Sequence, residues 1–151
     1  MTNIGNVYSR LGETQKALEY YNQALPIHRA VSSRAGEAMA LNNIATVYLA
    51  LREQQKALEY YNQALPIFRA VSNRSGEAGA LNNIGGVYSS LGEPQKALEY
   101  YNQSLPIRRA VSDRTGEANV AQRMGLTCPV TNRTIDWQRL VVVFQRLLRL
   151  P

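Results

Sequence analysis

Apolar residues recur along this chain with the spacing of one helix face. Between residues 77 and 91 they follow an i, i+3, i+4 rhythm, which predicts a helix that we name helix A, and Gly92 supplies its C-terminal stop. A second helix, helix B, is predicted from Pro94, because proline suits the first helical position, and we expect Gly116 to end it. The apolar face of helix A comprises Leu81, Ile84, Val87, Tyr88 and Leu91, and that of helix B comprises Ala97, Leu98, Tyr101, Ser104 and Leu105.

This pair of helices occurs three times. The nine residues QKALEYYNQ begin at Gln15 and recur unchanged from Gln55 and from Gln95, so the period is 40 residues. Two short helices cannot bury their apolar faces within one unit, whereas stacking of neighbouring units buries them. The sequence therefore predicts an all-α solenoid of antiparallel helix pairs, with seven or eight helices and no sheet. We expect three units, over residues 1–40, 41–80 and 81–118.

A proline stands at the same place in every helix B, at Pro26, Pro66 and Pro106. Proline removes one backbone hydrogen bond and crowds the preceding turn. Because the apolar pattern continues past each proline, we expect a kinked helix rather than a broken one.

The last part of the chain, residues 119–151, departs from the repeat. Ala121, Met124 and Gly125 still align with the start of a fourth unit, and Pro129 is expected to end its first helix. A final helix is predicted over residues 135–150. Its register favours a degenerate fourth unit with a C-terminal capping helix; the alternative is a basic amphipathic helix on an anionic membrane. The apolar face of that helix includes Trp137, Leu140, Val141 and Phe144.

The net charge of +6 is concentrated in this tail. Residues 119–151 contain five arginines against the single acidic residue Asp136, so the three units carry only +2. The charge of the units therefore gives little support to nucleic-acid binding.

The repeated motif resembles the tetratricopeptide repeat family. In the third unit the motif consists of Leu81, Ile84, Gly85, Tyr88, Gly92, Ala97, Tyr101 and Ser104. The 40-residue length and the Asn-Asn-Ile motif are similar to the variant found in kinesin light chains and in many cyanobacterial repeat proteins. The resemblance implies a right-handed superhelix in which helix A of each unit lines a concave groove, and it implies that the groove holds a peptide or a partner's helix.

The resemblance also implies which side chains face the groove. An Asn side chain offers a donor and an acceptor, so a row of Asn suits the backbone of an extended peptide. The alternative is that one Asn of each pair caps or bridges neighbouring helices. The lysines that clamp a terminal carboxylate in some relatives are missing. The candidate groove residues are Asn3, Asn6, Arg10, Asn42, Asn43, Thr46, Asn82, Asn83, Gly86 and Ser89.

Residues suited to catalysis or metal binding are scarce. His28 and Cys128 are the only residues of their types, so no metal site with several His or Cys ligands can form. No nucleophile and base form a recognisable constellation, and we expect no enzymatic activity, metal or cofactor.

The tyrosine pairs are interpreted as packing residues rather than as platforms on which nucleic-acid bases stack. We expect Tyr21, Tyr61 and Tyr101 in the core. We expect Tyr20, Tyr60 and Tyr100 at unit boundaries or on the convex surface.

These features predict a cytoplasmic protein–protein interaction scaffold. Its partner is expected to be a protein or peptide, not a nucleic acid or a membrane, and the alternatives are a self-assembling repeat fragment or, less favoured, RNA binding. The compartment follows from the single cysteine and the lack of a secretory signal. A homodimer is also expected, because the first helix A has an uncovered apolar face and Trp137, Leu140, Val141 and Phe144 form another apolar surface.

Overall fold

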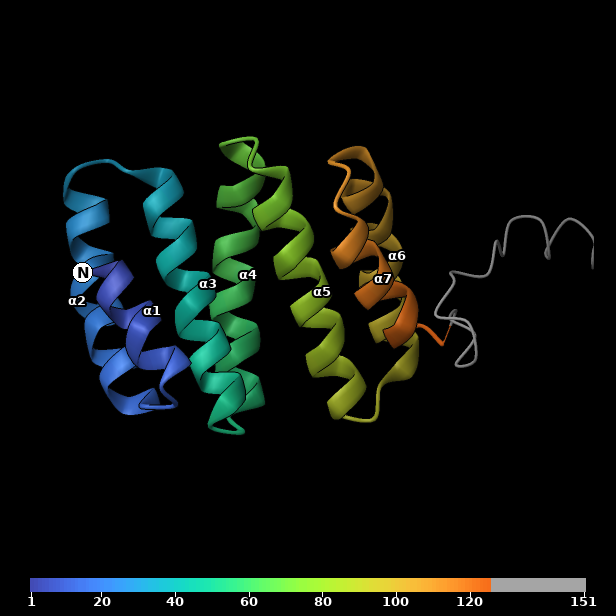
Figure 1. Ribbon diagram of the computed structural model, residues 1–151, viewed down its shortest axis with the longest axis horizontal. Helices are drawn as coiled ribbons and strands as arrows, with labels where there is room; N and C mark the ends of the chain where they lie inside the picture. The colour runs from blue at the N-terminus through green and yellow to red at the C-terminus, as the bar shows by residue number, and fades with distance from the viewer. Residues whose placement is uncertain (126–151) are drawn as a thin grey trace, which may run out of the picture.

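The computed structural model describes residues 1–125, and over that range the chain forms seven α-helices and no strand (Figure 1). Helix A of each pair corresponds to α1, α3, α5 and α7, and helix B to α2, α4 and α6. The helices are α1 (Thr2–Arg10), α2 (Thr14–Ala30), α3 (Arg34–Ala50), α4 (Gln54–Ala70), α5 (Arg74–Ser90), α6 (Pro94–Ala110) and α7 (Arg114–Arg123).

The helices pack in chain order, each against the next, and α3 also contacts α5. Figure 1 shows them as a row that extends from α1 at one end to α7 at the other. Contacts between sequence neighbours dominate, as expected for stacked repeats. The predicted all-α solenoid of helix pairs is confirmed.

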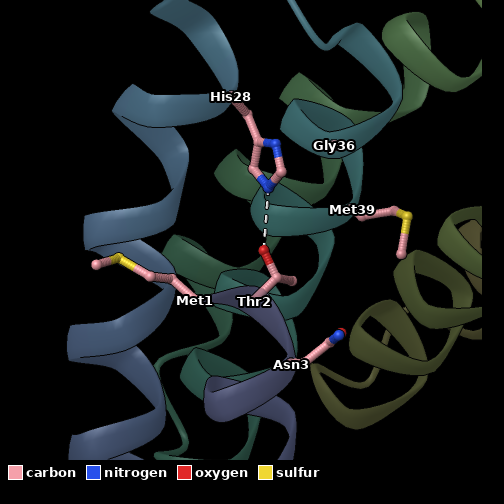
Figure 2. Close-up of a pocket in the computed structure, with 6 residues that line it drawn as sticks. All are labelled: Met1, Thr2, Asn3, His28, Gly36 and Met39. Carbon is pink, nitrogen blue, oxygen red and sulfur yellow. Dashed lines mark hydrogen bonds between the residues drawn. The ribbon is translucent and has the colours of Figure 1, made fainter. Parts of the chain in front are cut away.

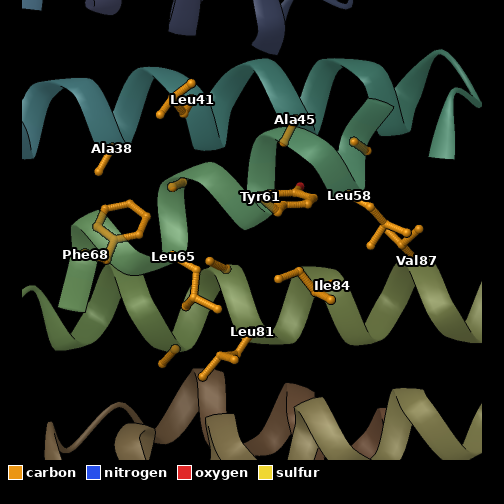
Figure 3. Close-up of a cluster of buried hydrophobic side chains, with 14 of the residues drawn as sticks. Ala38, Leu41, Ala45, Leu58, Tyr61, Leu65, Phe68, Leu81, Ile84 and Val87 are labelled. Carbon is orange, nitrogen blue, oxygen red and sulfur yellow. The ribbon is translucent and has the colours of Figure 1, made fainter. Parts of the chain in front are cut away.

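The core lies between the helix layers and is built from the repeated apolar positions (Figure 3). The rings of Tyr21, Tyr61 and Tyr101 are buried, as the sequence predicted. Small side chains such as Ala57 and Ala64 let α4 approach its neighbours closely, while Leu41 and Ile84 fill the remaining space.

Short turns with one left-handed residue join the helices. After the four A helices, the residues with positive φ are Gly12 at 75°, Arg52 at 63°, Gly92 at 76° and Gly125 at 70°. The turns after helix B place Ser32, Ser72 and Ser112 in the same region. These residues end the helices.

Gly116 does not end helix B, so this prediction is wrong. Helix α6 already ends at Ala110, and Gly116 lies in the first turn of α7. The Asp113 side chain caps α7 by accepting a hydrogen bond from the Gly116 amide at 2.8 Å. In the same way Asn73 caps α5, which begins at Arg74 rather than near residue 77.

The three prolines within helix B do not break it. Helices α2, α4 and α6 are continuous through Pro26, Pro66 and Pro106. Each loses one backbone hydrogen bond, which the flanking turns and the packing of the helix tolerate.

Leu98 is another correction. We expected it in the core, but it is 38% exposed, whereas its equivalents Leu18 and Leu58 are buried. Leu18 packs with Ile44 and Val47 of the next helix A. Helix α7 has 10 residues against the 17 of α3, so it is too short to cover Leu98 in the same way. The predicted final helix, with Trp137, Leu140, Val141 and Phe144, lies outside the described residues.

Candidate functional site

Four of the candidate groove residues meet in one hollow between α1 and α3. Asn6 and Arg10 come from α1, and Asn43 and Thr46 come from α3. The hollow has a volume of about 230 Å³ and is also lined by Ser9 and Tyr21. The 40-residue period places equivalent faces of successive A helices side by side, so side chains from different units converge here.

The hydroxyl of Tyr21 connects the core to this hollow. Its ring is buried, and its hydroxyl donates to Oδ1 of Asn6 at 2.7 Å. Nδ2 of Asn43 donates to the same oxygen at 3.1 Å. Asn6 and Asn43 are therefore held in place by a bond between two A helices. Asn43 bridges neighbouring helices, as the alternative interpretation expected, yet its own Oδ1 and second N–H stay available to a ligand.

The second unit repeats this arrangement with another residue. Oγ1 of Thr46 lies 3.0 Å from the hydroxyl of Tyr61, and it also donates to the backbone carbonyl of Asn42 at 3.0 Å. Burial raises the pKa of Tyr61 and of Tyr21. Both hydroxyls therefore remain protonated at neutral pH and keep their role as hydrogen-bond donors.

A second hollow, of about 410 Å³, lies between α5 and α7. It is lined by Asn82, Asn119, Gln122 and Arg123, so an arginine and three amides face it. The guanidinium of Arg123 lies above Gly86, where a Cβ would collide with Nη1. The first and second hollows together contain Arg10 and Arg123 and no carboxylate.

The remaining candidate residues lie around these hollows. Asn83 and Gly86 are half-buried and Ser89 is exposed on α5. The Oδ1 atoms of Asn42 and Asn82 are buried and have no hydrogen-bond partner among residues 1–125.

Asn3 belongs to a separate hollow of about 320 Å³ (Figure 2). The His28 side chain lines this hollow and points toward Thr2, with its Nε2 3.0 Å from Oγ1 of Thr2. The His28 ring packs against Gly36, as Phe68 packs against Gly76, which indicates a packing role for this variable position.

Sequence reasoning missed Asn119, Gln122 and Arg123. The signal was present, because the 40-residue register aligns Arg123 with Asn43 and Asn83. Because the residues after 118 depart from the repeat, the sequence pattern alone assigns them no groove positions.

The first tyrosine of each pair stacks on a tyrosine of the preceding helix A. Tyr20 stacks on Tyr8 with ring centroids 5.3 Å apart, and Lys16 lies over the Tyr8 ring at 5.2 Å. Hydrogen bonding to Glu13 raises the pKa of Lys16. The other two pairs repeat this stack at 5.4 and 5.5 Å. These tyrosines thus stack within a helix pair.

Within residues 1–125, no group of three or more His, Cys, Asp or Glu side chains is placed to hold a metal ion. None of the described helices combines the length and the apolar character needed to cross a membrane.

A tetratricopeptide repeat family model matches residues 1–70 and 76–128. The chain belongs to the tetratricopeptide repeat family. The curated proteins compared with it give no match.

Solved structures show the same tetratricopeptide fold at low sequence identity. Aspartyl phosphate phosphatase F from Bacillus subtilis superposes with a TM-score of 0.76 at 17% identity, over 82% of this chain and 32% of that protein. The tetratricopeptide domain of Arabidopsis FLU gives a TM-score of 0.68 at 22% identity, over 72% of this chain and 92% of that domain. The N-terminal domain of stress-induced protein-1 from C. elegans superposes with a TM-score of 0.63 at 18% sequence identity. The match covers 81% of this chain and 90% of that domain. This chain thus spans about a third of the length of the Bacillus protein.

Proposed function

We propose that this chain is a protein-interaction scaffold that binds an extended peptide segment along its A helices. The observation that carries the proposal is that the A helices present amide side chains in two hollows, one between α1 and α3 and one between α5 and α7. Asn6 and Asn43 are fixed by hydrogen bonds to each other and to Tyr21, so they offer preorganised donors and acceptors. An extended peptide backbone needs such groups at regular intervals. The single cysteine favours a reducing compartment, and we propose the cytoplasm.

The proposal can be tested without knowing the natural partner. Dodecamer peptides would be selected from a random displayed library on the wild-type chain, and the affinity of a selected peptide would be measured by calorimetry. Changing Asn43 and Asn83 together to Ala removes two hydrogen bonds, each contributing about 1 kcal/mol. The expected loss is roughly 30-fold in affinity.

The matched control changes Asn22 and Asn62 to Ala, since these exposed asparagines lie on helix B. This control should bind the peptide as the wild type does. Circular dichroism should show the same helix content in all three proteins. If the Asn43/Asn83 variant keeps its affinity, or if the control loses as much, the A helices do not form the binding surface.

A second candidate function is self-association of this polypeptide, as a homodimer. Ile4 and Val7 on α1 are 45% and 56% exposed, whereas the equivalent Ile44 and Val47 on α3 are 0% and 2% exposed. Ile44 and Val47 are covered by Leu18 and its neighbours on α2. A second copy that covers α1 would remove this apolar face from water.

A further inference from the structure

The first helix pair presents an apolar face at the end of the row of helices (Figure 1). Besides Ile4 and Val7 of α1, this face contains Met1, which is 58% exposed, and Ile27 of α2, which is 47% exposed. The period of 40 residues gives each of the four an equivalent in the second and third units. We call these four residues the end face.

The equivalents of the end-face residues are covered in the later units. Leu41, the equivalent of Met1, is 1% exposed, and Ile107, an equivalent of Ile27, is 6% exposed. The isoleucine and the valine of α3 and α5 are buried as well. The same residue types at the same spacing are thus open to solvent only in the first pair.

A preceding helix B covers these residues with one stripe of apolar side chains. Leu18 of α2 packs with the isoleucine and the valine of α3. On α4 the stripe consists of Leu58, Leu65 and Phe68, which pack toward α5 (Figure 3) and share one apolar cluster with Ile107 of α6. Spacings of seven and three residues place the two leucines and the aromatic ring on one side of a helix.

We infer that the end face docks an amphipathic helix of a partner protein, in the place that a helix B takes on the later units. The face is the periodic continuation of the contacts between α2 and α3 and between α4 and α5. The docked helix carries two leucines seven residues apart and an aromatic residue three positions further on. Their burial against Ile4 and Val7 removes apolar surface from water on both partners.

This inference rests on the α1 face that also carries the proposed self-association, and it names a different occupant for it. It does not depend on the peptide groove. A docked helix and a second copy of the chain cannot cover Ile4 and Val7 at the same time. The partner's helix would therefore compete with self-association.

The helix-B sequence of this chain supplies a probe. The peptide of residues 54–70, acetylated and amidated at its ends, carries the stripe of α4. Its control carries Leu58→Ser, Leu65→Ser and Phe68→Ser. Each peptide is titrated into the ¹⁵N-labelled full chain, because NMR detects the weak binding expected of a short helix that must fold as it docks. We expect saturable shifts of the amides around Ile4 and Ile27, and binding of the control on the order of tenfold weaker or less.

Two variants of the chain connect the binding to the end face. One combines Ile4→Ser with Val7→Ser, and the other is Ile27→Ser. All three side chains are exposed, so circular dichroism should show the helix content of the wild type. Both variants should bind the α4 peptide more weakly, by roughly tenfold for the double change. Leu91→Ser, which changes an exposed leucine directly after α5, should preserve the binding.

Equal binding of the two peptides would overturn the inference. So would unchanged binding in the double variant, or shifts confined to the groove around Asn6, Asn43 and Asn83. Light scattering separates these results from the proposed self-association. If the chain is monomeric at every concentration and the α4 peptide binds, the docking face stands and self-association is wrong. If the chain associates through Ile4 and Val7 but the peptide neither binds nor lowers its mass, self-association stands and the docking is wrong.

Discussion

The ring of Phe68 lies directly against Gly76, so closely that a Cβ on this glycine would be 2.5 Å from Cδ1 and Cε1 of the ring. His28 makes the same contact with Gly36. The glycine at this place is therefore a notch in helix A that receives a side chain of the preceding helix B.

The notch makes Gly76→Ala destabilising. A methyl group there forces the Phe68 ring out of a closely packed position at a cost of about 1–3 kcal/mol, which exceeds the gain of about 1 kcal/mol in helix propensity. Gly79 of the same helix has nothing within 4 Å of a Cβ. Gly79→Ala should therefore raise the melting temperature while Gly76→Ala lowers it. Shifts in the same direction for both variants would argue against the notch.

Arg52 stands where Gly12 and Gly92 stand in the other units, at a φ of 63°. A side chain in this left-handed region costs about 1 kcal/mol relative to glycine. Arg52→Gly should raise the free energy of unfolding by about that amount, measured by urea denaturation. The reverse change, Gly92→Arg, should lower it. Unchanged stability in both variants would show that the turns relax to other angles.

Glu37 connects two helices through a buried carboxylate. It accepts hydrogen bonds from Nε of Arg29 and Nη1 of Arg34, both at 2.9 Å. The hydrogen bond from Arg29 is the main cause that lowers the pKa of Glu37. Because the folded pKa is below the unfolded one, this carboxylate stabilises the fold above the unfolded pKa, and the stabilisation is lost as the pH falls through the folded pKa.

The stability difference between the wild type and Glu37→Gln should thus be constant near neutral pH. It should shrink as the pH falls below about 4.3, the usual value for Glu. Melting temperatures from pH 3 to pH 7 would show this, with Glu19→Gln as an exposed control. A difference that is independent of pH would mean that the charge of Glu37 does not stabilise the fold.

The uncovered face of α1 predicts that this polypeptide self-associates. Changing Ile4 and Val7 to Ser should shift the mass measured by light scattering toward the monomer at high concentration, without loss of helix content. Leu11, an exposed residue directly after α1, provides a further position to vary. A wild-type mass that stays monomeric at every concentration would contradict the prediction.

The repeat made much of the fold predictable from the sequence. A 40-residue period with two apolar faces requires stacked helix pairs, and the register alone places Tyr21, Tyr61 and Tyr101 in the core. The repeat does not predict the length of the helix that follows the last complete unit. Leu98 is exposed because α7 is shorter than α3 and α5, which the pattern in the third unit did not indicate.

The candidate site was predictable only in part, for a physical reason. Sequence register shows that Asn6, Thr46 and Gly86 are equivalent, but not that the first two contact a tyrosine hydroxyl. The space beside Gly86 is filled by the guanidinium of Arg123, a residue 37 positions later at the end of α7. Long side chains from a neighbouring helix cannot be placed by periodicity.

The position of a bound peptide tests the central claim most directly. Backbone amide shifts of the labelled chain would be recorded by NMR as a library-selected dodecamer is added. We predict that the perturbed amides cluster in α1, α3 and α5, around Asn6, Asn43 and Asn83. Perturbations confined to the exposed faces of α2, α4 and α6 would contradict a peptide-binding surface on the A helices.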